Sequence, residues 1–146
     1  MIPALNDDGN LPPGVHWATW DEIYAQFGGT ERRRELLAGL GEALAALHAA
    51  GCSAVYVDGS FVTSKEHPAD FDGCWDMTGV DPVLLDPVLL DFANGRAKQK
   101  AKYMGELFPS TSPSAAAGPT FLEFFQTDKN TGSPKGIIAI DLRRLG

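Results

Sequence analysis

The most informative stretch of the chain is VDGSFVTSKEHPADFDGCWD, residues 57–76. It begins inside SAVYVD, a short run of β-branched and aromatic residues at 53–58 that predicts a buried strand. Gly59 then opens a loop rich in turn-forming residues, and a second strand is predicted over 70–77. The stretch therefore predicts a strand, a loop and a second strand in succession.

Acidic residues occupy the start of the second strand. Asp70 and Asp72 are two positions apart, so in a strand their carboxylates share one face while Phe71 points the other way into a core. Adjacent carboxylates repel each other unless a cation lies between them, and Mg²⁺ or Mn²⁺ held by carboxylates and substrate phosphates is the usual solution. Gly59 would let a phosphate approach the backbone, and Ser60 adds a hydroxyl and an amide donor.

Helices and further strands are predicted on both sides of this stretch. Thr19 and Glu22 have the spacing of a capping box and predict a short helix, and a periodic apolar pattern predicts a longer helix over about 31–50. The other predictions are an extended arm at 1–15, an apolar helix from 81 that breaks at Pro87, a surface loop at 109–119, and strands at 120–127 and 135–142 joined as a hairpin. This order predicts one domain over 1–146 of the α/β (α+β) class, with a mixed β-sheet flanked by helices.

Composition limits the classes of function. A formal net charge of −7 argues against broad, non-specific binding to a nucleic-acid backbone. No stretch approaches the about eighteen apolar residues of a membrane span, and the first residues lack the basic and apolar regions of a signal peptide. Cys52 and Cys74 are expected to be inert, buried thiols of a reduced, cytoplasmic protein, although one disulfide is compatible with the sequence.

The Gly-Ser turn after a strand, followed by Asp-hydrophobic-Asp, resembles the signature of the nucleotidyltransferase superfamily. Gly59, Ser60, Asp70 and Asp72 match it position by position. The resemblance implies that the Gly-Ser turn holds a nucleoside triphosphate, that the two aspartates bind two metal ions, and that a third carboxylate on a later strand helps to activate the acceptor hydroxyl. Asp58 and Gly73 depart from the signature, which usually has apolar residues at both places.

Most of the chain also resembles an uncharacterised group of small bacterial nucleotidyltransferase-like proteins. The shared-looking segments are LPPG, DGSFVTSKE, DFDGCWD, FFQ and KGIIAIDL. Small transferases of this kind are often encoded in toxin–antitoxin pairs, so the resemblance implies a toxin role and an antitoxin protein as a partner.

The third carboxylate has three candidates. Glu123 is favoured, because it is the only acid in the apolar run FLEFFQ, and a charge buried in such a strand needs a partner such as a metal ion. Asp141 in IIAIDL is a rival that could instead pair with Arg143 or Arg144. Asp76 is a further option if the second strand stays regular beyond Asp72.

Basic residues supply candidates for phosphate binding. Many minimal transferases have an arginine where Thr63 stands, and Lys65 is expected to substitute for it; Lys135 is another candidate for neutralising pyrophosphate. The stretch 96–102, with Arg96, Lys98, Lys100 and Lys102, would form a phosphate-binding stripe if it were a strand, or a solvated surface if it were a helix or loop. The run Arg32–Arg34 at a helix start indicates either a partner surface or a solvated turn.

The expected function is a metal-dependent nucleotidyltransferase. It would transfer a nucleoside monophosphate from a nucleoside triphosphate to a hydroxyl of an RNA such as a tRNA, a protein or a small molecule. The alternative is a catalytically inactive module with the same fold that binds a second small protein. A phosphodiesterase or nuclease that uses the same carboxylates is a third reading, although it does not explain the Gly-Ser turn.

Overall fold

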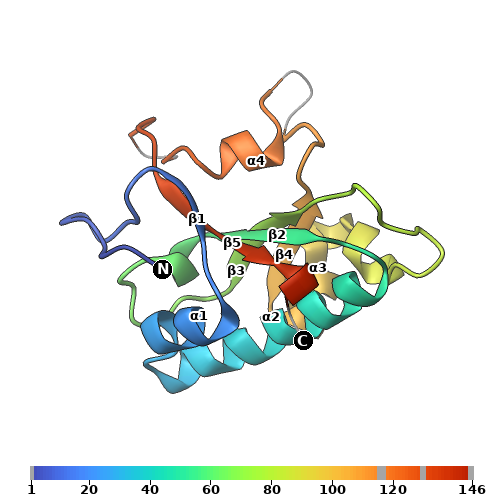
Figure 1. Ribbon diagram of the computed structural model, residues 1–146, viewed down its shortest axis with the longest axis horizontal. Helices are drawn as coiled ribbons and strands as arrows, with labels where there is room; N and C mark the ends of the chain where they lie inside the picture. Colours follow the sequence, from blue (N-terminus) through green and yellow to red (C-terminus); the bar gives the residue numbers. More distant parts are fainter. Residues whose placement is uncertain (1, 115–117, 129–130, 145–146) are drawn as a thin grey trace.

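The structure is a computed structural model that describes residues 2–114, 118–128 and 131–144. The described part of the chain contains a five-stranded mixed sheet with helices on both sides, which confirms the predicted fold class (Figure 1). The strands are β1 (Gly14–Trp17), β2 (Ala54–Asp58), β3 (Phe71–Trp75), β4 (Gly105–Pro109) and β5 (Gly136–Asp141). The helices are α1 (Trp20–Phe27), α2 (Glu31–Ala49), α3 (Ala93–Tyr103) and α4 (Phe121–Phe124), and short 3-10 turns lie at Ser60–Val62, Pro87–Leu90 and Leu142–Arg144.

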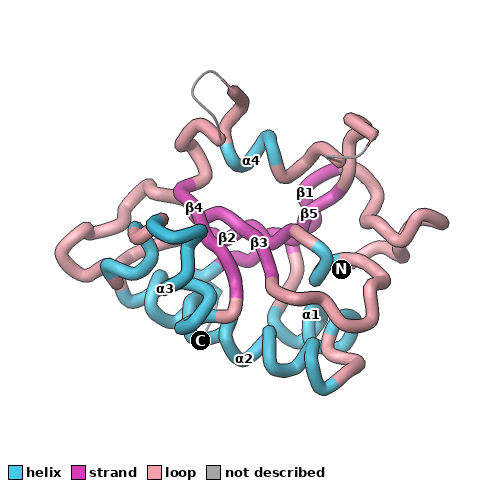
Figure 2. The backbone as a smooth tube through the Cα atoms, turned by 180° about the vertical axis from the view of Figure 1, so that it is seen from behind, coloured by secondary structure: helices cyan, strands magenta, loops and turns pink. Residues whose placement is uncertain are grey.

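The strand order across the sheet is β1-β5-β2-β3-β4. The two outer pairs, β1 with β5 and β3 with β4, are parallel, whereas β2 runs antiparallel to both of its neighbours. Helices α1 and α2 lie against one face of this sheet, and the short helix α4 lies over the other (Figures 1 and 2). Helix α3 packs beside the edge strand β4 and against α2.

Each face of the sheet has its own apolar cluster. On the face of α2, the helix leucines pack on every second residue of the strands, including Val57, Phe71 and Leu107. The opposite face is smaller and is covered by α4, which brings Phe121 and Phe125 onto the sheet. Burial of the α2 stripe follows from its apolar period, and Thr30 caps its start by accepting a hydrogen bond from the backbone N–H of Arg33.

The segments around the Gly-Ser turn follow the predictions closely. Helices over Trp20–Phe27 and Glu31–Ala49 are confirmed, as are the strands predicted at 53–58, 70–77 and 135–142. The predicted loops at 109–119 and 128–135 fall partly outside the described residues, at 115–117 and 129–130. Among the described residues, no helix is both long and apolar enough to cross a membrane.

Two other predictions are wrong, and two segments have structure that was not predicted. The arm at 1–15 contains the start of β1, which pairs with β5 near the far end of the chain. The apolar run from 81 forms turns and the 3-10 turn Pro87–Leu90, because aspartates accept hydrogen bonds from the backbone N–H groups two residues later and so favour turns. The expected strand at 120–127 is helix α4, started by a capping box of Thr120 and Glu123, so no hairpin joins it to β5. Finally, the unassigned stretch 95–108 contains most of α3 and β4.

Candidate functional site

Three carboxylates form a row across one end of the adjacent strands β2, β3 and β4. Asp58 ends β2 and is the register partner of Asp72 in β3. Asp72 is in turn the register partner of Glu106 in β4. Register partners present their side chains on the same face, so these acids from three adjacent strands lie side by side. They share the face that carries Cys74 and Phe108, which is the face covered by α4.

Asp70 extends this acidic row at the edge of the loop. It lies directly before β3, two residues from Asp72, while Phe71 between them is fully buried in the core on the opposite face. The predicted pairing of Asp70 and Asp72 on one side and Phe71 on the other is therefore confirmed. The acidic row, Asp58, Asp72 and Glu106 with Asp70 beside it, forms the candidate site.

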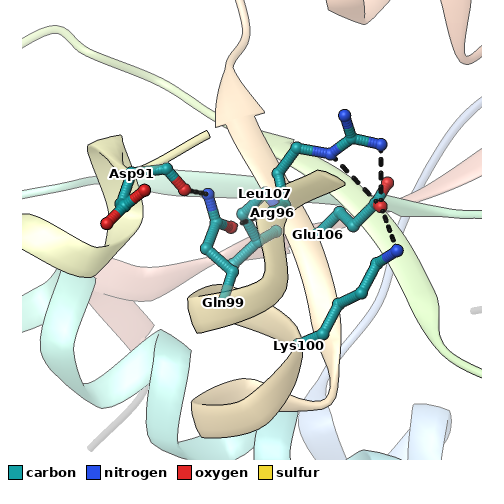
Figure 3. A network of polar contacts seen from close by, with 6 residues as sticks. All are labelled: Asp91, Arg96, Gln99, Lys100, Glu106 and Leu107. Atoms are coloured by element: carbon teal, nitrogen blue, oxygen red, sulfur yellow. Dashed lines mark hydrogen bonds and ion pairs between the residues drawn. The ribbon is translucent and has the colours of Figure 1, made fainter. Parts of the chain in front are cut away.

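Basic side chains bind both ends of the acidic row. Lys135, just before β5, places its Nζ 3.0 Å from Asp58 Oδ1, and both side chains are largely buried. At the other end, Glu106 Oε1 lies 3.0 Å from Arg96 Nη2 and 2.9 Å from Lys100 Nζ (Figure 3). Lys100 lies on the regular part of α3 and Arg96 in the left-handed turn at its start, and both reach the same carboxylate.

A buried amide fixes α3 relative to β4. Gln99 is fully buried, and its Oε1 accepts a hydrogen bond of 2.8 Å from the backbone N–H of Leu107 (Figure 3). Its Nε2 donates to the backbone oxygen of Asp91 at 3.5 Å. Because Gln99 lies between Arg96 and Lys100 on the helix, this anchoring holds both cations opposite Glu106.

The acids of the row have unequal pKa values. Burial, together with the negative charges of Asp70, Glu106 and Asp58, raises the pKa of Asp72 to about 7. Burial and the charge of Glu106 also raise the pKa of Asp70. Burial opposes ionisation of Glu106 as well, but hydrogen bonds from Lys100 and Arg96 outweigh it and hold the pKa of Glu106 below its ordinary value. The negative charge therefore resides on Glu106, and Asp72 takes up a proton first.

Gly59 brings the turn after β2 directly against Asp72. Its φ of +86° is in the left-handed region, and a Cβ added here would lie 2.7 Å from Asp72 Oδ2. Glycine is thus required both by the backbone conformation and by the contact with the carboxylate. Ser60 begins the 3-10 turn Ser60–Val62, and its side chain lies outside the described part of the structure.

Arg33 organises the loop that follows the Gly-Ser turn. Its guanidinium is buried between the rings of Phe27 and Phe61 and donates to the backbone oxygens of Phe61, Thr63 and Lys65. The neighbouring Arg32 donates to the backbone oxygens at 68 and 69, just before Asp70. The arginine run at the start of α2 is therefore neither a solvated turn nor a partner surface at these two positions, because it holds the loop in place.

The predicted third carboxylate, Glu123, does not belong to the acidic row. It lies on α4, and its Oε1 accepts hydrogen bonds from the backbone N–H and hydroxyl of Thr120. The same bonds lower the pKa of this solvent-exposed acid. The premise that Glu123 sits in a buried strand is wrong, and Glu106 is the acid that stands beside Asp72 on a later strand.

Both rivals lie at the opposite end of the sheet. Asp141 is the register partner of Ala54 at the start of β2 and pairs with Arg143, with its Oδ1 3.0 Å from Arg143 Nε. Asp76 follows the end of β3 and accepts a hydrogen bond from the backbone N–H of Thr78. Neither residue therefore reaches the end of the strands where Asp72 lies.

The basic stretch 96–102 divides between two places. As a helix it directs Arg96 and Lys100 to Glu106, whereas Lys98 pairs with Asp91 and Lys102 with Asp86. The stripe expected of a strand therefore does not form, because the stretch is helical, but two of its four cations reach the site. Lys65 is exposed on the loop, and its positive charge acts to lower the pKa of Asp70.

The departures from the signature have local explanations. Asp58 is held by Lys135, and Gly73 allows β2 and β3 to approach, because a Cβ there would lie 2.4 Å from the backbone oxygen of Tyr56. Both cysteines are free and buried, as predicted. Burial and the charge of Asp58 raise the pKa of the Cys74 thiol to about 12, so this thiol is unreactive at neutral pH.

The donor set of the acidic row suits a hard divalent cation. Within residues 2–114, 118–128 and 131–144, no group of three or more His, Cys, Asp or Glu side chains is already arranged to hold a metal ion. Two carboxylates suffice for Mg²⁺, however, because it keeps several waters and takes further oxygens from substrate phosphates. Asp70 and Asp72 meet this requirement, and the repulsion that raises the pKa of both would be relieved by a cation.

The sequence analysis did not predict Glu106 at the site, the role of Arg33 in holding the loop, or the ion pair of Lys135, which was predicted only as a candidate for neutralising pyrophosphate. Glu106 lies in GELFP, whose glycine and proline are more typical of a loop than of a strand. Only the pairing of β4 with β3 brings Glu106 next to Asp72. The role of Arg33 had one signal, namely a cation at the positive end of a helix, which is unfavourable without a specific partner. The pairing of Lys135 with Asp58 had none.

Comparison with known proteins places the chain in one family. Residues 3–141 match DUF6932, a family of unknown function, and the chain belongs to it. No curated protein and no solved structure matches the chain significantly.

Proposed function

We propose that this member of a family of unknown function is a metal-dependent nucleotidyltransferase. The proposal rests on one observation: Asp58, Asp72 and Glu106 form a row on three adjacent strands, with Asp70 beside them and the Gly59 turn against Asp72. Paired aspartates next to a turn of this kind suit a nucleotide whose phosphates carry Mg²⁺ or Mn²⁺. The substrates would be a nucleoside triphosphate and a hydroxyl of an RNA, a protein or a small molecule.

Asp70 and Asp72 would hold the divalent ions together with the triphosphate. When bound, these ions would neutralise the phosphate oxygens and stabilise the charge that develops during the transfer. Gly59 lets the backbone of the turn lie directly against Asp72, so a phosphate bound through a metal ion at Asp72 would be close to that turn. Arg32 and Arg33 would keep that turn in place through the backbone oxygens of the loop.

The transfer needs an acceptor oxygen in line with the α-phosphorus. In this step a bond forms from the acceptor oxygen to the α-phosphorus, the bond from that phosphorus to the bridging oxygen breaks, and pyrophosphate leaves with its electrons. Glu106, beside Asp72 on the next strand, would orient the acceptor hydroxyl and accept its proton. Lys65, Lys100 and Lys135 are the cations available to neutralise pyrophosphate.

The alternative is a catalytically inactive module with the same fold that binds another small protein, such as an antitoxin. The ion pairs at the site favour it specifically. Lys135 compensates Asp58, and Arg96 and Lys100 compensate Glu106, so the protein's own cations already satisfy part of the acidic row. An enzyme would have to exchange some of these contacts for metal and phosphate.

Calorimetry with each of the four nucleoside triphosphates, with Mg²⁺ and with EDTA, separates the two functions. The transferase proposal predicts Mg²⁺-dependent binding by the wild type that is lost in the double variant Asp70→Asn/Asp72→Asn. Asp76→Asn is the matched control, because it changes an aspartate next to the same strand at its far end. Failure of the wild type to bind any triphosphate would contradict the transferase proposal and favour the binding module.

A further inference from the structure

Three phenylalanine rings form a continuous stack next to the acidic row. Phe92, which precedes α3, stacks on Phe108 of β4 with centroids 5.6 Å apart and planes 15° apart. Phe108 stacks in turn on Phe121, the first residue of α4, with a separation of 4.1 Å and an angle of 7°. Three separate segments thus contribute nearly parallel rings to one stack.

The stack adjoins the acidic row through a shared strand. Phe108 follows Glu106 by two residues in β4, so both side chains lie on the same face, about 7 Å apart along the strand. Arg96 joins the two features. Its guanidinium donates to Glu106 and also lies 5.7 Å from the centroid of the Phe108 ring. A positive charge therefore stands where the acids end and the aromatic rings begin.

Phe92 is the open end of the stack. It keeps 40% of its surface exposed, although it is a large apolar residue. Phe121, at the other end, also packs against Phe125. Phe92 consequently keeps exposed aromatic surface beside two rings that are already stacked, and stacked rings of this kind are how proteins present a platform to a planar ligand.

The backbone between Phe92 and Arg96 is held in an uncommon conformation. Asn94 and Arg96 have φ values of 53° and 62°, in the left-handed region. For residues other than glycine this costs about 1 kcal/mol or more each, and such strain is concentrated at functional sites. The turn brings Arg96 back over Phe108 while Phe92 remains stacked on the same ring.

We propose that the exposed face of Phe92 binds a nucleobase, with Arg96 between that base and the phosphates at the acidic row. This inference rests on the proposed function, because it takes the phosphates to lie at Asp70 and Asp72. The base belongs either to the nucleoside triphosphate or to the end of a nucleic-acid acceptor. The chemistry of recognition is the same in both cases: stacking of a π-system on the ring, with a neighbouring cation.

The test compares ligands with and without a base. Calorimetry with Mg²⁺ is performed with ATP, with inorganic tripolyphosphate and with a short oligoribonucleotide, for the wild type and for Phe92→Leu. Leucine keeps an apolar side chain but removes the π-face. We expect Phe92→Leu to weaken ATP binding roughly tenfold and to leave tripolyphosphate binding unchanged. If only oligoribonucleotide binding weakens, the base bound at Phe92 is that of the acceptor.

Two further variants keep the result interpretable. Phe92→Tyr retains an aromatic face and should bind each ligand as the wild type does. Unchanged binding of tripolyphosphate by Phe92→Leu shows that the leucine variant is folded. Phe124→Leu alters another exposed phenylalanine, which meets Phe125 edge-on, and should change no binding constant. Metal-dependent binding of ATP with no effect of Phe92→Leu on any ligand would overturn this inference alone. Binding of neither ATP nor tripolyphosphate by the wild type would overturn the proposed function as well.

Discussion

Asp72 and Glu106 are register partners on two parallel strands, and burial together with the neighbouring negative charges raises the pKa of Asp72 to about 7. Two acids this close do not both ionise readily, so one of them retains its proton to a higher pH. Lys100 and Arg96 keep the charge on Glu106, so the proton belongs to Asp72. The pair therefore makes the stability of the metal-free protein sensitive to pH.

The first prediction concerns that sensitivity. The pKa of Asp72 rises from an ordinary value of 3.8 to about 7 in the folded protein. Between these values the unfolded chain has lost a proton that the folded chain retains, so the free energy of unfolding falls as pH rises through this range. We expect Asp72→Asn to remove much of the decrease and to be more stable than the wild type at pH 8, by about 1–2 kcal/mol.

Urea denaturation at pH 5 and pH 8, in EDTA, measures this difference. Asp76→Asn is the control, and its free energy of unfolding should change with pH as that of the wild type does. A wild type whose stability rises steadily from pH 5 to pH 8 would contradict the assignment of the proton to Asp72. Glu106 acts with the opposite sign, because its lowered pKa gives stability that is lost only as the pH falls further into the acid range.

A second prediction concerns Gly59. In Gly59→Ala, the new methyl group would meet Asp72 Oδ2 at 2.7 Å and the backbone nitrogen of Asp72 at 3.2 Å, at a φ of +86°. Gly132 has a φ of +74° with open space around its Cβ position, so Gly132→Ala introduces the backbone strain without the contact. We expect Gly132→Ala to cost about 1 kcal/mol and Gly59→Ala clearly more. Equal losses in thermal or urea denaturation would show that the approach to Asp72 is unimportant.

A third prediction tests Arg33 as the residue that positions the loop. Arg33→Met would leave the backbone oxygens of Phe61, Thr63 and Lys65 without this donor, and we expect a loss of about 2–4 kcal/mol. Hydrogen exchange should become faster in the loop at 61–65 before it does so in the sheet. Arg34→Met is the matched control, since that side chain is exposed and donates to a single backbone oxygen, that of Gly28. Similar losses in both variants would argue against this role.

Local patterns predicted the part of the fold that surrounds the Gly-Ser turn. The apolar period of α2 and the β-branched run of β2 were informative because those segments are buried on regular faces. The aspartate pair was readable because a strand separates alternate residues onto opposite faces, and the buried Phe71 between them confirms that alternation.

Long-range pairing was beyond such patterns. Strand β1 has four residues of mixed exposure, and its partner lies more than a hundred residues away in the sequence. Strand β4 contains Pro109, which an edge strand tolerates but which reads as a loop. The aromatic residues of α4 are typical of a strand, but the capping box and the packing of Phe121 on Phe108 stabilise a short helix instead. For these two reasons Glu106 was not predicted beside Asp72, and Glu123 was predicted in a strand that is a helix.

The exchange of Glu123 for Glu106 gives a fourth prediction. Glu106→Gln removes a charge from the acidic row and leaves Arg96 and Lys100 without their carboxylate, so any Mg²⁺-dependent transfer should fall by at least about a hundredfold. Glu123→Gln should retain transfer, with only a small loss of stability from its capping box. Incorporation of labelled nucleoside monophosphate into an acceptor measures transfer. The reverse order of effects would restore Glu123 as the third carboxylate.

The last prediction concerns the other end of the acidic row. Lys135 and Asp58 form an ion pair whose side chains are only 20% and 6% exposed, so removal of one partner leaves a charge in a poorly solvated place. We expect Lys135→Met to cost about 3 kcal/mol and Asp58→Asn somewhat less. The double variant should recover part of this loss, because neither charge is then unpaired. Urea denaturation of all four proteins at pH 7 gives the coupling energy, and strictly additive losses would mean that the pair contributes no interaction of its own.

Because Asp58 is the register partner of Asp72, Lys135→Met should also increase the negative potential at Asp72 and shift the pH-dependent loss of stability to a higher pH.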